Sequence, residues 1–90
     1  MNTTGYKRQY GYSSFTCIYP GIKAWMERHD WNLTRLAKEA NVTRSALSKN
    51  LIGITSMSMY TIRQIMSVTG LTFEQAFGEE ITLEEAREER

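Results

Sequence analysis

The stretch LAKEANVTRSALSKNL, residues 36–51, ends one helix and begins another with no room for an ordinary loop. Before the interruption, apolar residues recur at helical spacing behind the N-cap residue Asn32: Leu33, Leu36, Ala37 and Ala40. After it, Thr43 is a suitable N-cap for a helix over Arg44–Leu51, with Ala46, Leu47 and Leu51 expected to face inward. The stretch therefore predicts two short helices that meet at a sharp corner.

The residues at this corner meet the steric needs of such a turn. Ala37 is small enough for the second helix to cross the first, and Leu47 can be buried against it. Asn41 tolerates a left-handed backbone better than most residues, and Val42 can fill the inside of the corner. This is the helix-turn-helix pattern, in which one face of the second helix projects outward and can enter a DNA major groove.

Three further helices are expected around this pair. Residues 22–29 place Ile22, Trp25, Met26 and His29 on one face. Ser58 caps a helix that ends at Gly70, whose inward residues should be Met59, Ile62, Ile65 and Met66. Thr72 and Gln75 have the spacing of a capping box for a short helix ending near Phe77. The sequence thus predicts an all-α domain over residues 22–78.

The two ends of the chain differ from this domain in composition. Residues 1–21 are rich in Tyr, Ser, Thr and Gly, with Lys7 and Arg8 as their only charges, and we expect an N-terminal arm. Residues 79–90 carry six Glu against two Arg, a net charge of −4, and form an acidic C-terminal tail. Thr82 and Glu85 repeat the capping-box spacing there, but the stretch LEEAREER lacks an apolar stripe and is expected to fray.

Residues 22–78 resemble the lambda-repressor/Cro-like, or XRE-type, helix-turn-helix family. LAKEANVTRSALSK is similar to the family's Leu-Ala, turn and recognition-helix motif, and SMYTIRQIMSVTGLTFEQAF is similar to its fourth and fifth helices. Asn41 stands where the family usually has Gly, and Asn50 where it often has an apolar residue. The resemblance implies a five-helix DNA-binding domain that recognises double-stranded DNA as a homodimer.

The resemblance also implies which residues would contact DNA. Base contacts fall on the first two turns of the recognition helix, at Arg44, Ser45, Ser48 and Lys49. Contacts to phosphates fall on helix caps and nearby polar residues: Asn32, Lys38, Thr43, Ser56 and Ser58. For the caps, a purely structural role is an equal alternative. The basic arm is a further candidate for DNA contact or for binding a protein partner.

Composition makes several other classes of protein improbable. The chain has 90 residues, enough for one domain, and no apolar run long enough to cross a bilayer or to serve as a secretory signal. Its single cysteine, Cys17, fits a reducing cytoplasm. Neither a metal-binding Cys/His cluster nor a catalytic set or Gly-rich phosphate loop is evident. We therefore expect a cytoplasmic protein that is not an enzyme and has no cofactor.

These features predict a DNA-binding transcriptional regulator, most similar to a phage or prophage repressor that binds a palindromic operator. Two alternatives use the same fold. One is an antirepressor or modulator that binds a protein, which the low net charge of +1 and the acidic tail favour. The other is the antitoxin of a toxin–antitoxin pair. The basic residues near the corner favour DNA over the protein-binding alternative.

Overall fold

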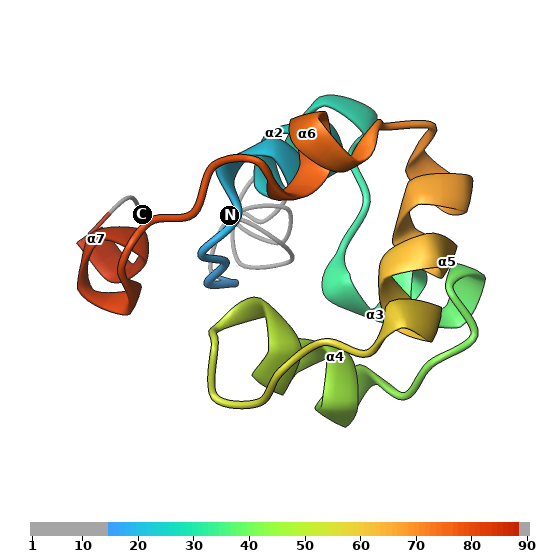
Figure 1. Cartoon of the computed structure of the whole chain (residues 1–90), viewed down its shortest axis with the longest axis horizontal. Helices are drawn as coiled ribbons and strands as arrows, with labels where there is room; N and C mark the ends of the chain where they lie inside the picture. The colour runs from blue at the N-terminus through green and yellow to red at the C-terminus, as the bar shows by residue number, and fades with distance from the viewer. Residues whose placement is uncertain (1–14, 89–90) are drawn as a thin grey trace, which may run out of the picture.

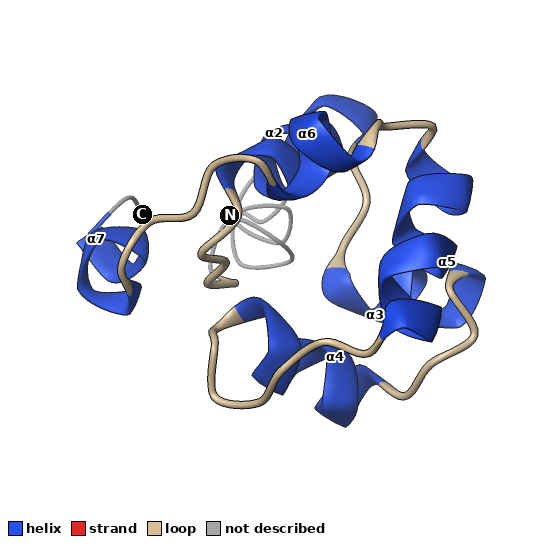
Figure 2. Cartoon of the chain, in the orientation of Figure 1, coloured by secondary structure: helices blue, strands red, loops and turns tan. Residues whose placement is uncertain are grey.

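A computed structural model describes residues 15–88, and this part of the chain is helical, without strands (Figures 1 and 2). All-α architecture is therefore confirmed for these residues, but they form six helices where five were predicted. In chain order the helices are α2 (Pro20–His29), α3 (Leu33–Glu39), α4 (Arg44–Leu51), α5 (Met59–Thr69), α6 (Phe73–Phe77) and α7 (Leu83–Glu88).

The helices begin where the cap residues were predicted. The side chains of four N-caps each accept a hydrogen bond from a backbone N–H three residues later; they are Asn32, Thr43, Ser58 and Thr72. Thr72 and Gln75 complete the predicted capping box. Only α2 starts earlier than expected, at Pro20, because proline suits the first helical position and needs no hydrogen-bond partner there.

The core lies where α2, α3, α4 and α5 converge. Its largest fully buried side chains come from all four helices: Ile22, Met26, Leu36, Leu47, Leu51 and Ile65. α6 packs against α2, and α3 packs against α4. At the α2–α6 contact, a Cβ atom added at Gly21 would overlap the backbone carbonyl oxygen of Gln75. Only glycine allows so close an approach of these two helices.

The predicted set of inward residues in α5 is only partly right. Ile65 is fully buried as predicted, and Ile62 and Met66 are half-buried, but Met59 is 60% exposed. Thr61, which was not in the predicted set, is buried, and Val68 packs partly buried against the core. The buried face of α5 is therefore turned away from Met59 and centred on Ile65.

Packing extends beyond the predicted boundary of the domain at residue 22. Residues 1–14 of the predicted arm lie outside the described residues, whereas Cys17 and Ile18 are buried in the core. The Ile18 N–H donates to the Leu51 carbonyl oxygen at 2.8 Å, and the Ile81 N–H donates to the Ile18 carbonyl oxygen at 2.8 Å. Residues from both flanks therefore pair with each other and with the end of α4.

The stretch that was expected to fray is helical as far as residue 88, and residues 89–90 lie outside the described residues. Residues 83–88 form α7, which lies at one end of the molecule in Figure 1. Thr82 Oγ1 accepts from the Glu85 N–H at 3.1 Å, and Glu85 Oε1 accepts from the Thr82 N–H at 3.0 Å. This reciprocal cap and the full burial of Ala86 stabilise a helix that periodicity alone does not predict.

Across residues 15–88, no helix combines the length and the apolar character that crossing a bilayer requires.

Candidate nucleic-acid interface

The predicted corner is present between α3 and α4. Residues 40–43 connect the two helices, and Asn41 has the expected left-handed backbone with φ of 60°. The Val42 N–H donates to the Ala37 carbonyl oxygen at 3.0 Å, which closes the end of α3. Val42 packs against the core and Ala37 is 3% exposed, as the sequence predicts. The turn is thus built by local backbone hydrogen bonds around one unusual residue.

α5 holds this corner from outside the two helices. The Asn41 Nδ2 group donates to the Tyr60 hydroxyl oxygen at 2.9 Å. One turn further along α5, the Gln64 Nε2 group donates to the Ala40 carbonyl oxygen at 3.1 Å. Neither partner could be predicted from the sequence, because no local pattern links residues 19 and 24 positions apart in the chain. The two contacts fix α5 against the turn and so help to set the angle between α3 and α4.

α4 has one buried and one exposed face. Leu47 and Leu51 are fully buried, as expected, whereas Ala46 is exposed and was wrongly predicted to face inward. Ala46 belongs to the first turn of α4, where its backbone N–H serves the Thr43 cap and its methyl group points away from α3.

Three of the four predicted base-contacting residues are exposed on α4, namely Arg44, Ser45 and Lys49, and Ser48 is half-buried. Arginine and lysine can donate to the O6 and N7 atoms of guanine, and serine can donate to or accept from several bases. The exposed face of α4 therefore has the chemistry that reading a major groove requires. Its buried face anchors the helix in the core.

The predicted phosphate-contacting residues fall into groups according to the hydrogen bonds that they already make within the protein. Asn32 Oδ1 accepts from the Arg35 N–H at 2.8 Å, and Thr43 Oγ1 accepts from the Ala46 N–H at 3.1 Å. Both caps use an acceptor, so the amide N–H groups of Asn32 and the hydroxyl of Thr43 can still donate to a phosphate. The Ser58 hydroxyl instead donates to Thr61 Oγ1 at 3.1 Å, which makes Ser58 a poorer candidate. Lys38 and Ser56 are exposed.

The Asn50 side chain forms hydrogen bonds with the loop that follows α4. Its Nδ2 group donates to Thr55 Oγ1 at 2.8 Å and lies 3.4 Å from the Thr55 carbonyl oxygen and 3.3 Å from that of Ser56. An apolar residue at this position would leave these acceptors without the amide. Asn50, which is polar where the resembled family often has an apolar residue, thus has a structural role in this loop. The sequence alone did not assign this role to it.

Arg35 is held at the start of α3 by aromatic rings. Its guanidinium carbon lies 4.2 Å from the centre of the Trp31 ring, a cation–π geometry. Trp31 meets Trp25 edge-on at 4.9 Å, and His29 stacks on Trp25 at 4.1 Å. Trp25 and His29 lie on one face of α2, as predicted: Trp25 is 7% exposed, and His29 is exposed but stacks on it. The aromatic cluster restrains a positive charge next to the Asn32 cap.

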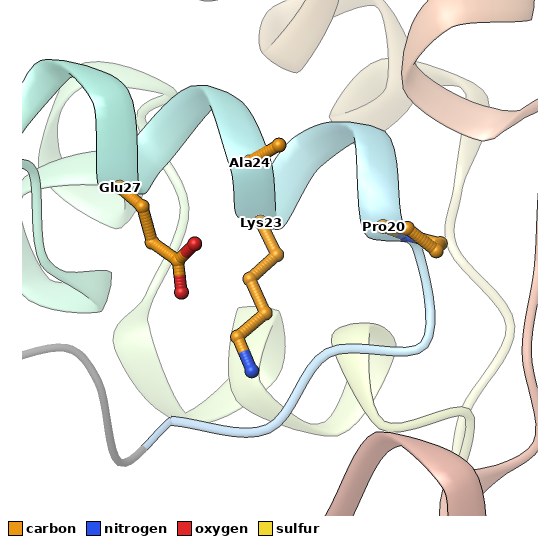
Figure 3. A pocket seen from close by; sticks show the side chains of 4 residues that line it. All are labelled: Pro20, Lys23, Ala24 and Glu27. Atoms are coloured by element: carbon orange, nitrogen blue, oxygen red, sulfur yellow. The ribbon is translucent and has the colours of Figure 1, made fainter. Parts of the chain in front are cut away.

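A shallow hollow of about 330 Å³ follows α2 and is lined by Pro20, Lys23, Ala24 and Glu27 (Figure 3). Lys23 and Glu27 extend from the same side of the helix, one turn apart. The Lys23 Nζ atom lies 6.0 Å from the centre of the Phe15 ring, and the residue is 6% exposed. Within residues 15–88 no group of three or more His, Cys, Asp or Glu could hold a metal ion.

No family model, curated protein or solved structure matches the chain.

Proposed function

We propose that this protein is a sequence-specific DNA-binding transcriptional regulator with a lambda-repressor-like helix-turn-helix domain. The observation that carries the proposal is the α3–α4 corner, which buries Leu47 and Leu51 and leaves Arg44, Ser45 and Lys49 in water. This arrangement suits insertion of α4 into a major groove, with the N-terminal turns nearest the bases.

In the proposed complex, the caps of α3 and α4 orient the protein and α4 reads the sequence. Asn32 and Thr43 donate to phosphates, and Lys38 supplies positive charge. Arg44 and Lys49 then meet base edges, where a good contact discriminates by about 1–3 kcal/mol against the wrong base. Two chains bind a palindromic operator with half-sites about one helical turn apart, and occupancy of the operator represses transcription by blocking polymerase.

A second candidate function is binding to a protein, as in an antirepressor, a modulator or an antitoxin. The observation that favours it is the exposure of two large apolar side chains, Met59 and Phe73, which are 60% and 53% exposed. The acidic helix α7 also suits a protein partner better than DNA. The two functions can be separated by variants of α4.

The test is selection of bound sequences from a random DNA pool at a stated salt concentration, followed by affinity measurements on Arg44→Ala/Lys49→Ala. We expect the double variant to lose about 1–3 kcal/mol of operator binding for each specific contact removed. Circular dichroism should show an unchanged helical content, because both side chains are exposed.

Arg28→Ala is the matched control, because it removes one exposed charge from α2 rather than from α4. It should weaken binding to all sequences slightly and equally, whereas Arg44→Ala should relax selection at particular base pairs. The proposal is wrong if the wild-type chain selects no sequence even at low salt, where attraction to phosphates is strongest.

A further inference from the structure

A groove of about 290 Å³ lies between α5, α6 and the N-cap of α2. Its walls are mainly apolar, and the residues that line it include Tyr19, Met57, Ile62, Phe73, Phe77 and Glu80. The Phe77 ring lies 5.2 Å from the Tyr19 ring and 5.4 Å from the Phe73 ring, centre to centre. Phe73 is 53% exposed, so part of this aromatic wall is open to water.

The groove carries negative charge on its wall. Glu80 lines it and is exposed, and the neighbouring Glu79 is exposed as well. Burial raises the pKa of the Tyr19 hydroxyl, and the Glu80 carboxylate raises it further, which places that charge against the aromatic wall. Within residues 15–88, Glu80 forms no ion pair. Phosphates would be repelled here, so the groove suits an occupant that combines aromatic side chains with positive charge.

Residues 1–14 of the same chain have this composition. They carry Tyr6, Tyr10 and Tyr12 together with Lys7 and Arg8, and they contain no acidic residue. Aromatic rings pair favourably with other rings when they meet edge-on or offset, and a lysine or an arginine complements a carboxylate. The segment therefore matches the groove both in apolar surface and in charge.

The length of the chain allows residues 1–14 to reach the groove. Phe15, the first described residue, lies four residues before Tyr19, so the segment ends within about 14 Å of the groove wall. Lys7 lies eight residues before Phe15, and an extended chain of that length spans up to about 28 Å. Because the segment is tethered, its effective concentration at the groove is about millimolar, and a weak contact is enough.

We propose that residues 1–14 dock in this groove of their own chain. A tyrosine ring of the segment packs against Phe73, and Lys7 or Arg8 meets the Glu80 carboxylate. The consequence for DNA rests on the proposed function, since docking keeps two positive charges from contacting phosphates beside α4. The docking itself is tested without DNA.

The experiment is limited digestion of the full chain with trypsin, followed by intact-mass analysis over time. Trypsin cuts after lysine and arginine, and Lys7 and Arg8 are the only such residues before Lys23. The cleavage rate tracks the fraction of the segment that is undocked, so Phe73→Ala and Glu80→Gln should each speed cleavage there by about three- to tenfold. Both side chains are exposed, and circular dichroism should show unchanged helical content.

Each variant has a matched control. Ile54→Ala removes part of an apolar side chain that is 64% exposed and does not line the groove. Glu39→Gln removes an exposed carboxylate from α3. Both controls should be cleaved at the wild-type rate. Equal rates in the wild type and all four variants would overturn the docking, as would controls that are cleaved as fast as Phe73→Ala.

Two further outcomes separate docking from its alternatives. Protection that grows with protein concentration would place the segment on another copy of the chain and would also overturn the docking. A docked segment in a chain that binds no DNA would refute only the proposed function. An undocked segment in a chain that binds an operator would refute only the docking.

Discussion

Asn41 is the residue on which the α3–α4 corner depends most. It has a left-handed backbone, with φ of 60°, and its side-chain amide also donates to the Tyr60 hydroxyl. Glycine would satisfy the first role without the second. The choice of Asn therefore combines tolerance of the turn with a hydrogen bond to α5 that holds the turn in place.

Substitution of Asn41 should separate these two contributions. Asn41→Ala places a less tolerant residue at positive φ and removes the amide, and we expect a loss of about 1–2 kcal/mol in the free energy of unfolding. Asn41→Gly removes only the amide, so its cost should be smaller. Tyr60→Phe is the control for the hydrogen bond alone. Urea denaturation measures all three, and equal stabilities of the Ala and Gly variants would contradict the role of the backbone.

Residues whose partners are close in sequence were the most predictable. Each predicted cap between Asn32 and Thr72 needs only a backbone N–H three residues away, so spacing and residue type suffice. Asn50 and Gln64 could not be assigned in this way. The acceptors of Asn50 lie in the irregular loop after α4, which follows no standard spacing, and the acceptor of Gln64 lies 24 residues away at the end of α3.

Helix α5 shows where periodicity stops being informative. Its apolar residues cover a wide arc of the helix, and helical spacing placed Met59, Ile62, Ile65 and Met66 together on the inward side. In the fold Ile65 is fully buried, Ile62 and Met66 are half-buried, and Met59 is 60% exposed. Met59 was expected in the core and is found in water. Its exposure therefore needs an explanation other than core packing.

The contact between α2 and α6 depends on Gly21. In an exposed helix, replacing glycine by alanine should stabilise by about 0.5–1 kcal/mol. Here the added methyl group would overlap the Gln75 carbonyl oxygen, and overpacking of this kind costs about 1–3 kcal/mol. We therefore expect Gly21→Ala to lower the thermal midpoint, with the steric cost exceeding the gain in helix propensity.

The direction in which Gly21→Ala shifts the thermal midpoint is the informative result. A raised midpoint would mean that α6 moves away from α2 at little cost. Ala24 is an exposed position on the same helix, and Ala24→Gly provides the control for helix propensity at a site whose side chain is not buried. It should destabilise by about 0.5–1 kcal/mol.

Across the whole molecule, charge is separated between the corner and the C-terminal helix. Residues 22–78 carry seven Lys and Arg against four Asp and Glu, a net charge of +3, whereas residues 79–90 carry −4. Figure 1 shows α7 at the end of the molecule away from α5, beyond α2 and α6. This asymmetry follows from the sequence, but the sequence does not show that Glu84, Glu85 and Glu88 lie on a capped helix.

A fixed negative charge should oppose the approach of DNA from a distance. Glu84 and Glu88 are exposed on α7, and neither takes part in the Thr82–Glu85 cap. Glu84→Gln/Glu88→Gln should therefore keep the helix and raise nonspecific DNA affinity a few-fold at low salt. The gain should disappear at high salt, because the Debye length falls from about 30 Å at 0.01 M to about 3 Å at 1 M. Fluorescence anisotropy across this range of salt concentration measures the DNA affinity. A gain in affinity that persists unchanged at high salt would show direct contact of α7 with DNA instead of long-range repulsion.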